Sequence, residues 1–290
     1  MVGETGQLTT ADGRRLAYRR LGSGPTLVCH PGGPGFSSFY LSNMGGLDDE
    51  LELVLLDPRG TGQSDAAGDA GAYRIDDYAD DLEELREHLG VERMQLLGHS
   101  HGGVAAVAYA AKHPERVERL ILASSLARFG PEQASAMEAA MESRAGQPWY
   151  DDAREAIETE LRGEFSTCRE LTDLVLRMFP FYFATYGDEE QAYVRSLGEE
   201  EFCIEATRLW EREIFEHFDL RPLLSRLSMP TLVITGSEDF ITGPRAAEDF
   251  AAIAGSRSVI LDGAGHMIFV EAPDRFCEAV LSFLGVEAAA

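Results

Sequence analysis

The stretch Met94-Gln-Leu-Leu-Gly-His-Ser-His-Gly-Gly103 places a serine between glycines directly after a short apolar run. Residues 94–97 have the composition of a buried strand, and the Ala-rich residues 104–111 have that of a helix. A strand that turns at once into a helix strains the residue at the turn and leaves room only for small residues two places before and after it. The pattern predicts that Ser100 is a nucleophile, and that the helix amides beside it stabilise developing negative charge.

Predicted strands and helices alternate on both sides of this turn. Strands are expected at residues 7–10, 14–21, 25–30, 51–56, 119–124, 230–236 and 258–262. Asp12-Gly13 is a strong turn between the first two strands. Helices are expected at residues 75–89, 244–253 and 273–284, the first closed by Gly90. This order is typical of an α/β fold, with a mostly parallel twisted sheet flanked by helices.

Residues 129–218 break this alternation, because they contain helical patterns and no convincing strand. The helical segments are expected at residues 132–143, 151–162, 168–178, 189–197 and 200–217. We therefore predict a helical cap inserted into the α/β core. The core then comprises residues 1–127 and 219–290, and the cap residues 128–218.

Composition limits the class of partner. Acidic residues outnumber basic ones by 50 to 25, giving a net charge of −25, which argues against nucleic acid or an anionic membrane. The four cysteines lack the spacing of a disulfide framework or a zinc site. The N-terminal residues lack the pattern of a signal peptide, and no apolar run is long enough to span a bilayer. We expect a cytoplasmic enzyme that uses neither metal nor organic cofactor, and leave its oligomeric state open.

A serine nucleophile needs a base that is itself oriented by an acid. His266 lies in a glycine-rich loop after the last predicted strand, and Asp239 lies in the loop after the preceding strand. Loops after parallel strands open at the same sheet edge as the serine turn. Glu238 is an alternative acid. The side chains of His99 and His101 are expected to diverge from Ser100. The remaining alternative bases are His30, His88, His113 and His217.

An oxyanion needs two amide donors near the nucleophile. The amide of His101, the residue after the nucleophile, is the expected first donor. The loop Pro31-Gly-Gly-Pro-Gly35 is too rich in glycine and proline for regular structure, and Gly33 is the expected second donor. The alternative is that this loop is only a tight turn.

The order Ser100, Asp239, His266 and the residues around them resemble the α/β-hydrolase superfamily. More narrowly, Gly32-Gly-Pro-Gly35 and Asp57-Pro-Arg-Gly-Thr-Gly-Gln-Ser64 resemble the prolyl aminopeptidase (proline iminopeptidase) group. The resemblance implies an α/β-hydrolase fold with a cap, these three residues as a catalytic triad, and Gly33 as an oxyanion donor. It also implies that the enzyme releases an N-terminal proline or small residue from short peptides through an acyl-enzyme.

The chain departs from this group at three places. Pro31 stands where the group has a histidine. The turn around the serine, the nucleophile elbow, reads Gly98-His-Ser-His-Gly102, where the group commonly has Gly-Gly-Ser-Trp-Gly. Phe240 replaces an acidic residue that some relatives carry after the aspartate equivalent to Asp239. The group recognises the substrate amine through carboxylates. Glu205 and Glu211 are the candidates by position, with solvated helix surface as the alternative.

Other readings concern the substrate and the class of protein. Residues 179–186 are rich in aromatic side chains, which either roof an apolar pocket or belong to the cap core. The elbow histidines and Phe240 favour a carboxylesterase or lactonase acting on small esters. The same triad serves carbon–carbon bond hydrolysis, and some proteins of this fold are non-catalytic ligand-binding proteins.

Overall fold

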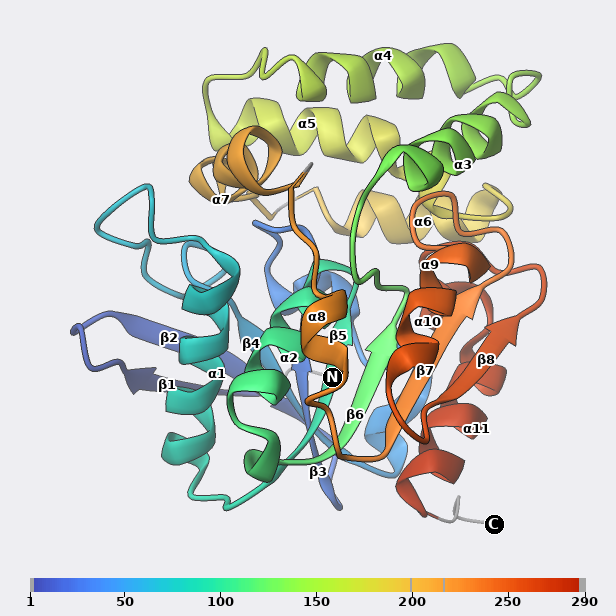
Figure 1. Cartoon of the computed structure of the whole chain (residues 1–290). Helices are drawn as coiled ribbons and strands as arrows, with labels where there is room; N and C mark the ends of the chain where they lie inside the picture. The colour runs from blue at the N-terminus through green and yellow to red at the C-terminus, as the bar shows by residue number, and fades with distance from the viewer. Residues whose placement is uncertain (1–2, 199, 216, 287–290) are drawn as a thin grey trace.

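The computed structural model describes residues 3–198, 200–215 and 217–286 and is built on an eight-stranded sheet (Figure 1). The strands are β1 Glu4–Thr9, β2 Arg15–Leu21, β3 Thr26–His30, β4 Glu52–Asp57, β5 Met94–His99, β6 Val117–Ala123, β7 Thr231–Gly236 and β8 Arg257–Leu261. Their order is β1-β2-β4-β3-β5-β6-β7-β8. Strand β2 pairs antiparallel with β1 and β4, and every other pair is parallel. The predicted mostly parallel sheet is confirmed.

The sheet is buried on both faces because successive residues of its strands point to opposite sides. In β4, Leu53 and Leu55 belong to one apolar cluster, whereas Val54 and Leu56 belong to a second. The cluster of Val54 includes α1 and α2, and that of Leu53 includes α11. The sheet is therefore the middle layer of three.

The helices cover these faces and the edge above them. The α-helices are α1 Ile75–Leu89, α2 His101–Lys112, α3 Pro131–Glu142, α4 Tyr150–Leu161, α5 Cys168–Met178, α6 Asp188–Ser196, α7 Ile204–Leu209, α8 Arg221–Leu224, α9 Pro244–Asp249, α10 Ile268–Glu271 and α11 Pro273–Leu284. Shorter helical turns are η1 Ser38–Leu41, η2 Met44–Asp49, η3 Pro114–Arg116, η4 Phe179–Tyr182, η5 Trp210–Ile214 and η6 Phe250–Ala252. Among the helices that the structure describes, none is long and apolar enough to cross a membrane.

Helices α3 to α7 lie between β6 and β7 in the chain and form a layer beyond the carboxyl ends of the parallel strands (Figure 1). The chain leaves and re-enters the core at neighbouring positions. Arg128 and Asp219 form an antiparallel bridge, and the Leu220 amide donates to the Ala127 carbonyl at 2.8 Å. These contacts join the two ends of the segment for which we predict a cap.

The last predicted cap helix, residues 200–217, is shorter in the structure. Helix α7 begins only at Ile204 and continues into η5, a turn of π-helix. The Cys203 amide donates to the Gly35 carbonyl at 2.9 Å, so this part of the backbone is bound to the glycine-rich loop of the core. Residue 216 lies outside the described residues.

Candidate active site

Ser100 occupies the strained turn between β5 and α2. Its backbone has φ 55° and ψ −123°, and its amide donates to the Ala123 carbonyl at 2.9 Å. A Cβ at Gly98 would overlap the Gly102 carbonyl, and a Cβ at Gly102 would overlap the His30 carbonyl. The two glycines are therefore needed for packing, as the spacing around the serine predicts.

His266 and Asp239 form a buried pair above β7 and β8. His266 Nδ1 lies 2.9 Å from Asp239 Oδ2, and the residues are 2% and 7% exposed. Asp239 also accepts from the Thr242 amide at 2.9 Å and the Thr242 hydroxyl at 2.6 Å. Burial raises the pKa of Asp239, but the His266 ring and the Thr242 donors outweigh it and lower this pKa from 3.8 to about 2. The carboxylate stays ionised and orients the ring.

The alternative acid, Glu238, is exposed, and its side chain accepts from the Ser237 hydroxyl at 3.3 Å. The structure thus pairs His266 with Asp239.

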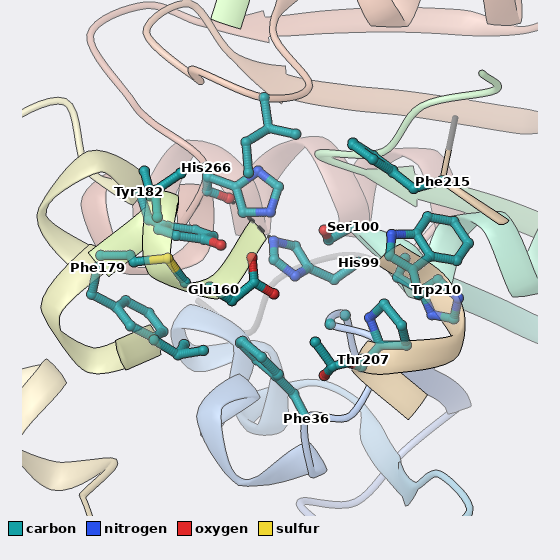
Figure 2. Close-up of a pocket in the computed structure, with 18 of the residues that line it drawn as sticks. Phe36, His99, Ser100, Glu160, Phe179, Tyr182, Thr207, Trp210, Phe215 and His266 are labelled. Carbon is teal, nitrogen blue, oxygen red and sulfur yellow. Dashed lines mark hydrogen bonds between the residues drawn. The ribbon is translucent and has the colours of Figure 1, made fainter. Parts of the chain in front are cut away.

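Ser100 and His266 line the same cavity, which has a volume of about 160 Å³. Figure 2 shows both side chains directed into it. The His266 loop is held by residues 128–218, the segment for which we predict a cap, because the His266 amide donates to the Tyr182 carbonyl at 2.7 Å. Glu271 accepts from the Gly265 amide at 2.7 Å and from the Ala184 amide at 2.7 Å, so it joins the same loop to the cap a second time.

The predicted oxyanion donors also lie at this cavity. Gly33 has φ 111°, a left-handed conformation that favours glycine, and it lines the cavity together with His101. His101 is the first residue of α2, where the helix amides are not used by the helix itself. The neighbouring Gly32 amide donates to the Tyr40 hydroxyl at 2.6 Å.

The histidines beside the glycine-rich loop and beside Ser100, namely His30, His99 and His101, are buried. The His99 ring lies 4.9 Å from the His266 ring and lines the same cavity as Ser100. His101 also lines the cavity, with its ring 4.7 Å from Trp210. Burial lowers the pKa of His99 to about 3, of His30 to about 4 and of His101 well below its usual value. All three rings are therefore neutral at pH 7.

Two carboxylates of the predicted cap segment line the cavity. Glu211 of η5 lines it, whereas Glu205 is exposed, lies outside the lining and accepts from the Cys203 thiol at 3.6 Å. Glu160, at the end of α4, also lines the cavity and points into it (Figure 2). The sequence pattern does not indicate Glu160, because one glutamate on an amphipathic helix resembles the solvated ones around it.

The charges of Glu160 and Glu211 both act on the Tyr182 hydroxyl. Burial raises the pKa of Glu160 from 4.5 to about 7. The pKa of the Tyr182 hydroxyl is raised by burial and by the negative charges of Glu160, Glu211 and Asp239. No lysine or arginine is among the described residues that line the cavity.

The rest of the lining is largely apolar. Of the aromatic run at residues 179–186, Phe179 and Tyr182 line the cavity, whereas Phe181 and Phe183 are buried in the core. The other aromatic side chains of the lining are Phe36, Tyr40, Trp210, Phe215 and Phe240. Within the described part of the chain, no group of three or more His, Cys, Asp or Glu side chains is placed to hold a metal ion.

Comparison with known proteins gives the same fold. The family model of the alpha/beta hydrolase fold matches residues 25–273. A proline iminopeptidase from Saccharolobus solfataricus is 30% identical over 285 residues, which cover 92% of this chain and 87% of that protein.

Solved structures add two further relatives. A hydrolase from Pseudomonas aeruginosa PA01 has 30% identity and a TM-score of 0.70, covering 99% of this chain and 100% of that one. The enol-lactonase from Burkholderia xenovorans LB400 has 26% identity and a TM-score of 0.73, covering 97% and 100%. The sheet order, the strand–helix turn at Ser100 and these matches agree: the chain is a hydrolase of the α/β-hydrolase family and resembles its proline iminopeptidases.

Proposed function

We propose that this hydrolase removes an N-terminal proline, or a similarly small residue, from short peptides. The observation that carries the proposal is the pair of cap carboxylates, Glu160 and Glu211, in a small cavity that also contains Ser100 and His266. The 30% identity to a proline iminopeptidase supports the same class of substrate.

In the first step, the Ser100 hydroxyl attacks the carbonyl carbon of the N-terminal residue. His266 takes the hydroxyl proton at Nε2, because its Nδ1–H is bound to Asp239 at 2.9 Å. The carbonyl oxygen becomes an oxyanion, to which the amides of Gly33 and His101 donate. The C–N bond then breaks, His266 returns the proton to the leaving amine, and the N-terminal residue remains on Ser100 as an ester.

In the second step, a water molecule attacks this ester and gives a proton to His266 Nε2. The Ser100 oxygen leaves and takes that proton back, and the N-terminal residue departs as a free amino acid. Both steps use only groups of this chain and water.

Recognition of the substrate amine falls to Glu160 and Glu211. A protonated amine that enters the cavity meets two carboxylates in surroundings of low dielectric, where charge-assisted hydrogen bonds are strong. Its positive charge also favours the ionised form of Glu160, whose pKa is about 7 in the free protein. An N-blocked peptide loses this interaction.

A carboxylesterase or lactonase is the second candidate. The apolar lining, with Trp210 and Phe215 beside the nucleophile cavity, also suits an acyl chain or a lactone ring. The enol-lactonase with a TM-score of 0.73 supports this reading.

The deciding experiment compares three substrates on one preparation: a proline arylamide, its N-acetyl form and a short-chain aryl ester. Our proposal predicts that the free arylamide is the best substrate and that N-acetylation abolishes its cleavage. Hydrolysis of the ester alone would identify an esterase. Turnover retained by Ser100→Ala would reject the serine mechanism, and no turnover of any substrate by the wild type would favour a ligand-binding protein.

Matched glutamine variants test the amine site. Glu160→Gln and Glu211→Gln should each raise KM for the free arylamide by about tenfold, since each removes one charge-assisted hydrogen bond. Glu205→Gln is the control, because Glu205 lies on the same cap segment but outside the cavity lining. Equal KM values for all three variants would exclude the two carboxylates from the amine site.

A further inference from the structure

A chain of three hydrogen bonds runs along the wall of the cavity from the His266 loop to the glycine-rich loop. His99 Nε2 lies 3.1 Å from the His266 carbonyl oxygen, and His99 Nδ1 lies 2.7 Å from the Tyr40 hydroxyl. The Tyr40 hydroxyl in turn lies 2.6 Å from the Gly32 amide. His99 and Tyr40 are 1% and 4% exposed, so these polar atoms depend on one another rather than on water.

The direction of each hydrogen bond follows from chemistry. The His266 carbonyl can only accept, so His99 Nε2 carries a proton and donates it. The His99 ring is neutral at pH 7 because burial lowers its pKa to about 3, and its Nδ1 therefore accepts. Tyr40 must donate its hydroxyl proton to Nδ1, which leaves the phenol oxygen to accept from the Gly32 amide. One tautomer of His99 satisfies all three bonds.

We propose that Tyr40 and His99 are positioning residues, which hold the general-base loop and the oxyanion loop in register. This inference rests on the proposed roles of His266 and of the loop that contains Gly33. Gly32 precedes Gly33, so fixing the Gly32 amide orients the peptide group that follows it. The hydrogen bond from His99 Nε2 to the His266 carbonyl fixes the backbone of His266, and the hydrogen bond to Asp239 fixes its ring.

The two loops come from distant parts of the chain, and Tyr40 and His99 connect them directly. Tyr40 lies on η1 after β3, and His99 ends β5, one residue before the nucleophile. A small shift of either loop changes the distance between the base and the oxyanion donors, to which turnover is sensitive. The residue before Ser100 therefore acts on the reaction through its neighbours.

The test uses Tyr40→Phe, which removes the central hydroxyl and keeps the ring. Turnover of a proline arylamide and the rate at which a fluorophosphonate labels Ser100 are measured per active site. We expect both rates to fall about tenfold, with KM changed less than twofold, as lost orientation affects the transition state more than binding. Tyr109→Phe is the matched control, because it removes another buried phenol hydroxyl. That hydroxyl donates to the Glu83 carboxylate at 2.8 Å, and neither residue lines the cavity.

A second pair of variants separates positioning from general loss of stability. In His99→Gln the amide can reach the His266 carbonyl, whereas in His99→Asn the side chain is too short. We expect His99→Gln to retain more activity per active site than His99→Asn at similar Tm. This comparison also decides the matter if Tyr40→Phe does not fold.

A double variant, Tyr40→Phe with His99→Asn, should lose no more activity than the worse single variant, because both changes break one network. Wild-type labelling by Tyr40→Phe, equal activity of the two His99 variants, or additive losses would each refute the relay. Labelling that persists in Ser100→Ala would instead refute the proposed function, so the two failures are distinguishable.

Discussion

Glu160→Gln should stabilise the protein at alkaline pH while it weakens binding of an amine substrate. The Glu160 carboxyl lines a largely apolar cavity, and its burial makes the charged form unfavourable in the free protein. Burial raises its pKa from 4.5 to about 7. The native protein therefore holds a proton between these two pH values that the unfolded chain has released.

The sign and size of the effect follow from this difference. Because the folded protein binds the extra proton, the free energy of unfolding falls as the pH rises from 4.5 to 7. Each pKa unit corresponds to about 1.4 kcal/mol, so ionised Glu160 costs about 3 kcal/mol above pH 7. Water reaches this half-buried side chain, and we expect about 2 kcal/mol after screening. Glutamine has no such charge, so the variant avoids this loss.

The measurement is urea unfolding of the wild type and of Glu160→Gln at pH 5 and pH 8. The stability of the variant relative to wild type should increase by about 2 kcal/mol between the two pH values. Glu205→Gln, at an exposed position, should show no such change. If the relative stability of Glu160→Gln is the same at both pH values, the carboxyl ionises normally and the electrostatic account of the cavity is wrong.

Three further predictions concern residues outside the lining of the cavity. Asp239→Asn should lower kcat by about 10³- to 10⁴-fold, seen in steady-state turnover, because the amide no longer holds His266 in the required tautomer. Gly102→Ala should destabilise the protein by about 1–3 kcal/mol in urea unfolding, since its Cβ would overlap a backbone carbonyl. Asp81→Asn should cost about 3–5 kcal/mol, measured by urea unfolding, because buried Arg59 loses a carboxylate bound at 2.7 and 2.8 Å.

The core of the fold could be predicted from the sequence, because its strands and helices follow from local patterns of apolar and turn-forming residues. Each predicted strand corresponds to an observed one within a few residues, from β1 to β8. The helix predicted to end at Gly90 does so, with Gly90 at φ 69°. Buried parallel strands need continuous apolar runs, and these are visible without knowledge of any contact.

Residues that act through distant contacts were not predictable in the same way. Tyr40 lies on η1, a 3-10 turn of four residues that is too short to show a periodic pattern. Glu160 lies on α4 among other acidic residues, and only the packing of the cap turns it toward Ser100. The motif at residues 57–64 indicated a resemblance to the prolyl aminopeptidase group but no role for its residues. In the structure its Arg59 forms a buried ion pair with Asp81 of α1, which supports the core.

Phe240 and Glu160 are connected through the predicted cap, because Phe240 packs against the cap and Glu160 belongs to it. Phe240 packs against Phe181 with ring centroids 5.7 Å apart and shares an apolar cluster with Met141 and Tyr150 of the cap. The loop after Asp239 thus anchors the cap, in the place where some proline iminopeptidases carry an acidic residue. On the proposed function, the second amine-binding carboxylate then comes from α4. Because Glu160 and the partners of Phe240 both belong to the cap, substrate binding depends on how the cap is seated. Phe240→Ala should therefore raise KM for a proline arylamide more than for an aryl ester; an equal rise for both would show that the two features are independent.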